Sequence, residues 1–130
     1  MSEEVLETTY VERAERVILD LLQSSGRRDG NQVTLNQLRK ILSLSNRILN
    51  RLEASHPEAQ APLNEDQLAQ LYALQVQIIY QSARMASVRT FQERSGILAE
   101  LKKVRSYGEF VAWHRYLEAL NAYQKYYASY

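Results

Sequence analysis

Apolar residues recur every three or four positions through most of this chain, the spacing that places them on one face of an α-helix. The first run contains Val11, Ala14, Val17, Ile18, Leu21 and Leu22. Two segments rich in turn-forming residues, 25–33 and 55–63, interrupt the repeats. Because a helix with one apolar face must bury that face against another element, the pattern predicts a bundle of helices.

The repeats predict five helices. We expect them over residues 10–25, 34–52 and 64–85, from between 87 and 90 to 104, and from 106 onward. Thr34 with Gln37 has the spacing of a capping box, in which two side chains satisfy the free amides of a helix start. Ser106 with Glu109 repeats this spacing, and Asn64 is a favoured N-cap residue. These caps place the starts of the second, third and fifth helices.

The composition supports a single all-α domain over residues 1–130. Four Gly and two Pro are too few for a β protein with many turns, and 45% hydrophobic residues are too many for a disordered chain. We expect one compact bundle of about five helices, with a flexible stretch at 1–8 and loops near 25–33 and 55–63. The third helix should be the most buried, because its apolar arc exceeds half of its circumference.

The reactive residue types argue against an enzyme. The chain has no cysteine, and its two histidines, His56 and His114, do not share a metal-binding spacing. No serine lies in a nucleophile elbow, and no glycine-rich phosphate loop is present. We therefore expect no catalytic residue, no metal, no cofactor and no small-molecule substrate. We interpret His114 as a packed or capping residue of the fifth helix.

A membrane location is also disfavoured. The longest uncharged stretch, 67–83, contains five glutamines and is shorter than the ~20 apolar residues of a membrane span. The first residues lack the basic and apolar segments of a signal peptide. The absence of cysteine fits a reducing compartment. We expect a soluble, cytoplasmic protein with no membrane partner.

Charge lies in blocks that the net charge of +1 conceals. Residues 26–56 carry six basic and two acidic side chains, and no carboxylate occurs inside the second predicted helix. At about 100° per residue, Lys40, Arg47 and Arg51 fall within about 40° of one another, opposite the leucines. Arg39 flanks this strip. Such a strip suits a phosphodiester backbone, and an ordinary solvated helix face is an equally good interpretation.

Two other helices carry polar strips. The third predicted helix has a narrow polar side made of Gln70, Gln77, Tyr80, Gln81 and Arg84. This side suits a protein neighbour, a nucleic-acid backbone or solvent. On the fourth helix Arg89, Gly96 and Lys103 are seven residues apart and line up. Gly96 either lets another backbone approach closely or is a tolerated weak point.

Tyrosines crowd the end of the chain. Tyr116, Tyr123 and Tyr127 share one flank, beside the apolar stripe of Phe110, Trp113, Leu117 and Leu120. Tyrosines in such a position lie at a core edge or in a protein interface more often than in a base-stacking platform. We predict that this flank takes part in association with a second copy or with partner subunits.

Four segments carry a family resemblance through their order and spacing. They are QLRKIL at 37–42, IYQSAR at 79–84, Val88 with Phe91, and YLEALNAYQKYY at 116–127. Together they resemble the small subunit of type III-A CRISPR effector complexes, the Csm small subunit, over residues 10–127. Relatives commonly have a glycine where this chain has Ala83 and a histidine where it has Gln124.

The resemblance implies a non-catalytic all-α subunit of a crRNA-guided surveillance complex in antiviral defence. Such a subunit stacks with copies of itself in a filament along the crRNA–target duplex and binds target RNA without sequence specificity. The matched motifs imply Arg39, Lys40 and Arg84 as RNA contacts, and helical geometry adds Arg47, Arg51, Arg89 and Lys103. The alternative function is a helical protein–protein adaptor or homo-oligomer that binds no nucleic acid.

Overall fold

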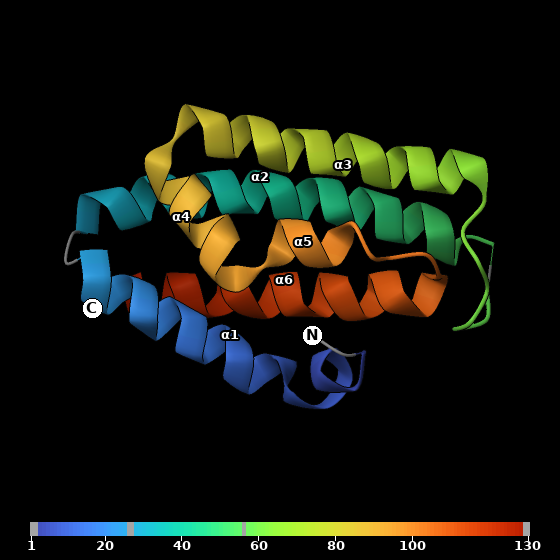
Figure 1. Ribbon diagram of the computed structural model, residues 1–130, viewed down its shortest axis with the longest axis horizontal. Helices are drawn as coiled ribbons and strands as arrows, with labels where there is room; N and C mark the ends of the chain where they lie inside the picture. Colours follow the sequence, from blue (N-terminus) through green and yellow to red (C-terminus); the bar gives the residue numbers. More distant parts are fainter. Residues whose placement is uncertain (1–2, 26–27, 56, 129–130) are drawn as a thin grey trace.

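The computed structural model describes the backbone of residues 3–25, 28–55 and 57–128 and the side chains of 9–23, 36–55 and 57–127. Its helices are α1 (Glu3–Ser25), α2 (Arg28–Glu53), α3 (Glu65–Arg84), α4 (Ala86–Ser95), α5 (Ile97–Leu101) and α6 (Tyr107–Ala128). The predicted all-α class is confirmed, with six helices in these ranges. The bundle is a row of α3, α2, α6 and α1, with α4 and α5 laid across one side (Figure 1).

The core lies around α6, which packs between α1 and α2 (Figure 1). Phe110, Trp113, Leu117 and Leu120, the predicted apolar stripe, are all fully buried. The expectation that the third helix is the most buried is wrong. Helix α3 is the edge of the row, so its neighbours cover only part of its apolar arc, and several of its large apolar side chains remain exposed.

The first loop is much shorter than predicted. Helix α2 begins at Arg28, so residues 28–33 are helical and Thr34 is not an N-cap. Once a helix has formed, adding residues to its end is inexpensive, and a single internal glycine costs only about 1 kcal/mol. Helix α1 begins at Glu3, seven residues before the predicted start at residue 10. Residues 1–2 and 26–27 lie outside the described chain.

The second loop lies where it is expected, between α2 and α3. Asn64 caps α3: its side chain accepts from the Gln67 amide at 2.8 Å, and the Gln67 side chain accepts from the Asn64 amide at 2.9 Å. The loop is also joined to the start of α6 by Pro62, which forms an isolated antiparallel bridge with Ser106. Gly108 donates its amide to the Ala59 carbonyl at 2.7 Å, and a Cβ on Gly108 would lie 2.6 Å from that oxygen.

The predicted start of α6 is nearly correct. The Ser106 hydroxyl accepts from the Glu109 amide at 3.2 Å, as in a capping box. The Glu109 carboxylate, however, accepts from the amide of Arg105 instead of Ser106, at 2.9 Å. The second bond of the capping box is therefore displaced by one residue, from the amide of Ser106 to the amide of Arg105.

The fourth predicted helix is two helices separated by Gly96. Gly96 has φ +77°, a left-handed conformation that favours glycine, and its amide closes α4 on the Gln92 carbonyl at 2.9 Å. Side chains from α6 bond the two carbonyls beside the break. Tyr116 donates to Ser95 at 2.7 Å, and Trp113 donates to Ile97 at 2.9 Å. Gly96 is therefore required by the backbone conformation.

The tyrosine flank is a core edge. Tyr116 is fully buried, and burial raises its pKa to about 12, so its hydroxyl stays protonated and donates to Ser95. Tyr123 and Tyr127 pack half-buried against the core, and the Tyr127 hydroxyl donates to Glu15 of α1 at 2.6 Å. The predicted role of this flank in association is wrong for Tyr116, whose side chain has no free surface.

His114 joins α6 to α2, as expected for a packed histidine. The Ser45 hydroxyl lies 2.6 Å from Nδ1 of His114, and both residues are buried. Burial lowers the pKa of His114, while Glu118 and Glu53 oppose this effect. Burial therefore disfavours the charged form of the imidazole that Ser45 contacts.

We predict that the free energy of unfolding falls as pH decreases below about 6.5, the pKa of a histidine in the unfolded chain. Between that value and the lower folded pKa, the unfolded state binds more protons than the folded state, so acid favours unfolding. In His114→Asn this contribution to the pH dependence of the free energy of unfolding should be absent. Chemical denaturation at about pH 7.5 and about pH 5.5 tests the prediction. An equal change in the free energy of unfolding between the two pH values in both proteins would contradict it.

Candidate nucleic-acid interface

Helices α2 and α3 run antiparallel and lie side by side (Figure 1). Each carries polar residues that recur along one line of the helix. Residues seven apart on a helix differ by only about 20° around its axis. On α2 the line is Lys40, Arg47 and Arg51; on α3 it is Gln70, Gln77 and Arg84. Nη1 of Arg51 lies 3.5 Å from Oε1 of Gln70, which sets the register of the two lines.

A groove of about 450 Å³ lies between these two lines. It is lined by Leu44, Arg47, Ile48, Arg51, Gln70, Ala73, Leu74 and Gln77. Its floor is apolar, since Ile48 and Leu74 belong to the core, while Arg47, Arg51 and Gln77 are exposed at its rim. We call this feature the α2–α3 groove. It combines a hydrophobic floor with guanidinium and amide groups at the opening.

The cations of α2 are available to a ligand. Arg39, Lys40, Arg47 and Arg51 are all exposed. Within the described side chains none of the four forms an ion pair with a carboxylate. From Lys40 to Arg51 the helix rises about 16 Å, so the charges form an extended strip. An unpaired strip of this kind attracts an extended anion.

Arg84 lies near the same edge. It ends α3, on the line of Gln70 and Gln77, and its guanidinium stands 5.7 Å from the centre of the Tyr80 ring. Because α3 is antiparallel to α2 and Gln70 lies beside Arg51, Arg84 falls at the end of the edge where Lys40 lies. The structure thus groups five of the seven predicted RNA contacts along two adjacent helices.

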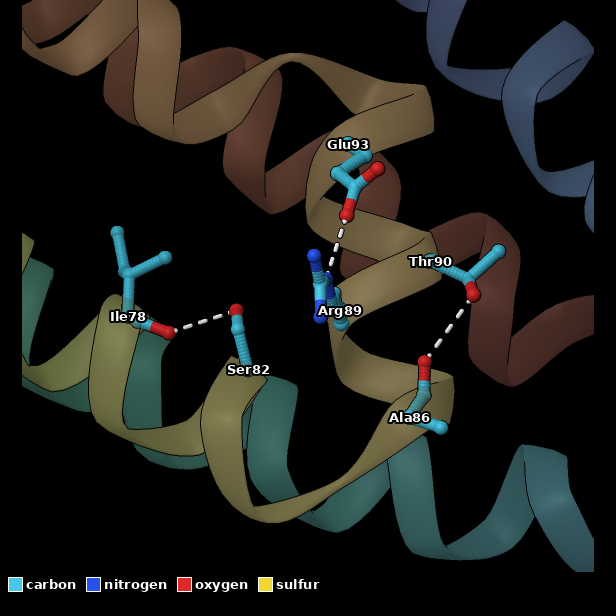
Figure 2. A network of polar contacts seen from close by, with 6 residues as sticks. All are labelled: Ile78, Ser82, Ala86, Arg89, Thr90 and Glu93. Carbon is cyan, nitrogen blue, oxygen red and sulfur yellow. Dashed lines mark hydrogen bonds and ion pairs between the residues drawn. The ribbon is translucent and has the colours of Figure 1, made fainter.

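The other two predicted contacts lie apart from the strip. Arg89 is on α4, where its Nε forms an exposed ion pair with Glu93 at 2.9 Å (Figure 2). Lys103 follows the end of α5 and is exposed. The expected alignment of Arg89, Gly96 and Lys103 is wrong, because it assumed one continuous helix and the chain turns at Gly96.

Figure 2 also shows how the neighbouring polar groups of this region are used. The Ser82 hydroxyl donates to the Ile78 carbonyl at 2.8 Å, and the Thr90 hydroxyl donates to the Ala86 carbonyl at 3.1 Å. Both bonds are local to their own helices. These hydroxyls therefore satisfy backbone groups and do not extend the basic strip.

Sequence reasoning missed an exposed apolar surface on α3. Tyr72, Val76, Ile79 and Tyr80 are each 47–60% exposed, and we call them the outer face of α3. The sequence signal was present in the wide apolar arc and the uncharged stretch 67–83. This signal predicts burial, whereas the structure leaves the four side chains exposed because no described element covers them.

The described residues contain no group of three or more His, Asp or Glu side chains placed to hold a metal ion. Across the same residues, no helix has the length and hydrophobicity needed to cross a membrane. The only buried histidine in this part of the chain, His114, is bonded to Ser45. The groove, the strip and the outer face of α3 are therefore the chemically distinctive surfaces in the described chain.

The chain is similar to one family of CRISPR proteins along most of its length. The family model described as Csm2 Type III-A matches residues 17–130. A CRISPR system Cms protein Csm2 from Streptococcus thermophilus is 33% identical over 119 residues, which are 91% of this chain and 90% of that protein. A protein of the same name from Mycobacterium tuberculosis is 33% identical over 124 residues, 94% of each chain. One from Enterococcus italicus is 32% identical over 100 residues, 75% of this chain and 69% of the relative.

Proposed function

Because the chain belongs to the type III-A Csm2 family and is a small subunit of a type III-A CRISPR complex, we propose that it binds the target RNA backbone without reading sequence. In this proposal it lies along the crRNA–target duplex in the cytoplasm, stacks with copies of itself and with other subunits, and catalyses no reaction. The observation that carries the RNA assignment is the strip of exposed cations on α2, which have no carboxylate partner among the described side chains.

The chemistry of the strip fits phosphate contacts. Arginine presents a planar fork that matches two phosphate oxygens, and lysine supplies a mobile point charge. Phosphate contacts set the position of a protein on a nucleic acid and carry no sequence information. In an RNA-guided complex, guide pairing reads the sequence, so such contacts are sufficient. Arg39, Lys40, Arg47, Arg51 and Arg84 are the central proposed contacts, and Arg89 and Lys103 remain outlying ones.

The outer face of α3 supports the assembly part of the proposal. Monomeric proteins rarely expose a contiguous row of large apolar side chains, and interfaces are enriched in aromatic residues. We propose this face as the contact with a neighbouring copy, and Tyr123 and Tyr127 of the tyrosine flank remain proposed contacts with copies or partner subunits. It also favours the alternative function, a helical protein–protein adaptor or homo-oligomer, which differs in predicting no RNA binding.

We predict that reversing two charges on α2 weakens RNA binding without unfolding the protein. In Arg39→Glu, Lys40→Glu, target-RNA affinity of the assembled complex should fall for all sequences, and the salt slope should shrink by roughly 0.7 to 0.9 for each phosphate that is no longer neutralised. Glutamate has nearly the same helix propensity as the residues it replaces. Affinity at about 50 mM and about 200 mM salt measures the effect.

A matched control reverses two exposed arginines elsewhere. Arg16 on α1 and Arg115 on α6 lie outside the α2–α3 edge, so Arg16→Glu, Arg115→Glu makes the same change in net charge. This control should bind RNA more tightly than the α2 variant. Circular dichroism should show both variants folded. Equal affinity and salt slope for the α2 variant and the unchanged protein would contradict the RNA assignment.

We predict that the outer face of α3 is needed for assembly. Val76→Gln, Ile79→Gln removes apolar surface and leaves the charge unchanged, so fewer copies of the chain should enter each complex because less apolar area is buried. Native mass spectrometry counts the copies. Val11→Gln, Leu19→Gln, which changes two exposed apolar residues of α1, is the control. Normal copy number in the α3 variant would refute this use of the face.

We predict that the purified protein does not cleave RNA. The described chain offers no metal cluster, and the sequence has no nucleophile elbow or phosphate loop to supply chemistry. Labelled single-stranded RNA incubated with Mg²⁺ or Mn²⁺ should remain intact. Cleavage that co-elutes with the protein and disappears on a point mutation in this chain would show that the subunit is an enzyme.

A further inference from the structure

We propose that the α2–α3 groove is a binding site for one unpaired RNA nucleotide, with the base against the apolar floor and the phosphate between Arg47 and Arg51. This inference rests on the proposed function, which brings RNA to the edge of α2. It goes further by assigning a base-binding site, where the strip alone needs only a phosphate backbone. The site deepens the contact without adding a preference for one base.

The apolar floor is the first observation. A strip of phosphate contacts needs only cations on a solvated helix face, whereas here core side chains Ile48 and Leu74 form the bottom of an open groove. A nucleobase is flat, with apolar faces and a polar edge. At about 450 Å³ the groove falls within the range of about 300–1,000 Å³ that small-molecule pockets occupy.

The rim supplies the second observation. Arg47 and Arg51 are one helical turn apart on the same wall, about 6 Å along the axis, so both can reach one phosphate and its sugar. A guanidinium plane can also stack on an unpaired base. Opposite them, Gln77 offers a donor and an acceptor, and Gln70, whose Oε1 already faces Arg51, offers its amide donor. Since amides can turn to suit either kind of base edge, this rim binds any base.

Charge decides between a nucleotide and a protein side chain. An aromatic or aliphatic side chain from a neighbouring subunit would cover the floor and enclose Arg47 and Arg51 at the rim. In the described chain these two guanidinium groups have no carboxylate partner. Enclosing unpaired charges is costly. A nucleotide brings the apolar surface and the compensating anion in one unit.

The test is photo-crosslinking in the assembled complex. Target RNAs carry a single 4-thiouridine at successive positions, and mass spectrometry maps each crosslink to residues of this chain. At one or more positions we expect crosslinks within 73–77 of α3 or 44–51 of α2. Base crosslinks confined to other segments, in a complex that binds RNA normally, would overturn the proposal.

A groove-filling variant makes the test specific. Ala73 is exposed and lines the groove, so Ala73→Phe should fill it without changing charge. We expect the groove crosslink to disappear while the salt slope stays unchanged. Ala69→Phe, an exposed position one turn earlier that does not line the groove, should keep the crosslink. A groove crosslink that persists in Ala73→Phe would overturn the proposal.

The outcomes separate this inference from the proposed function. If Arg39→Glu, Lys40→Glu weakens RNA binding and no base reaches the groove, the backbone contact stands and the nucleotide site is wrong. If neither RNA binding nor base crosslinks involve this chain, both proposals fail. Protein–protein crosslinks that place a neighbouring subunit in the groove would also overturn the nucleotide site.

Discussion

The break at Gly96 is the feature on which the arrangement of the helices depends. Here the chain leaves α4 and turns back over the bundle, and both flanking carbonyls are bonded from α6, one by Tyr116 and one by Trp113. Arg13 of α1 donates to the Ser95 carbonyl at 2.8 Å and lies over the Tyr116 ring. Side chains of α1 and α6 thus hold the break in place, while α4 and α5 lie across one side of the row and α3 lies at its edge.

The helices and most of the core follow from local patterns. Apolar spacing alone identifies the buried stripe of α6, and side-chain chemistry identifies Asn64 as a cap, because both depend on residues within one or two turns. Burial of α3 was not predictable in this way. Periodicity shows which side chains are apolar, whereas the neighbours that cover them are set by distant packing. The same limit applies to Gly96. From sequence alone, a glycine that ends a helix with a positive φ cannot be distinguished from a glycine tolerated inside a helix.

Local sequence likewise predicts only part of the candidate interface. The strip on α2 could be predicted because all of its members lie on one uninterrupted helix. Arg84 could be added because it lies on the same line of α3 as Gln70 and Gln77. Arg89 and Lys103 could not be placed, since their alignment required a helix that the chain interrupts. The groove itself had no signal in sequence. It arises from the relative position of α2 and α3, which the contact between Arg51 and Gln70 defines in the structure.

The bridge between the α2–α3 loop and the start of α6 restricts the number of residues that this loop can contain. Surface loops usually tolerate added or deleted residues. Here Leu63 donates to the Arg105 carbonyl at 2.9 Å and Tyr107 to the Ala61 carbonyl at 3.0 Å, while Gly108 leaves no room beside Ala59. An inserted residue near position 62 would shift Ala61 and Leu63 relative to Tyr107 and Arg105 and break this ladder. This connection is therefore a poor position for a tag, a circular permutation or a domain insertion, although it is exposed and outside the helices.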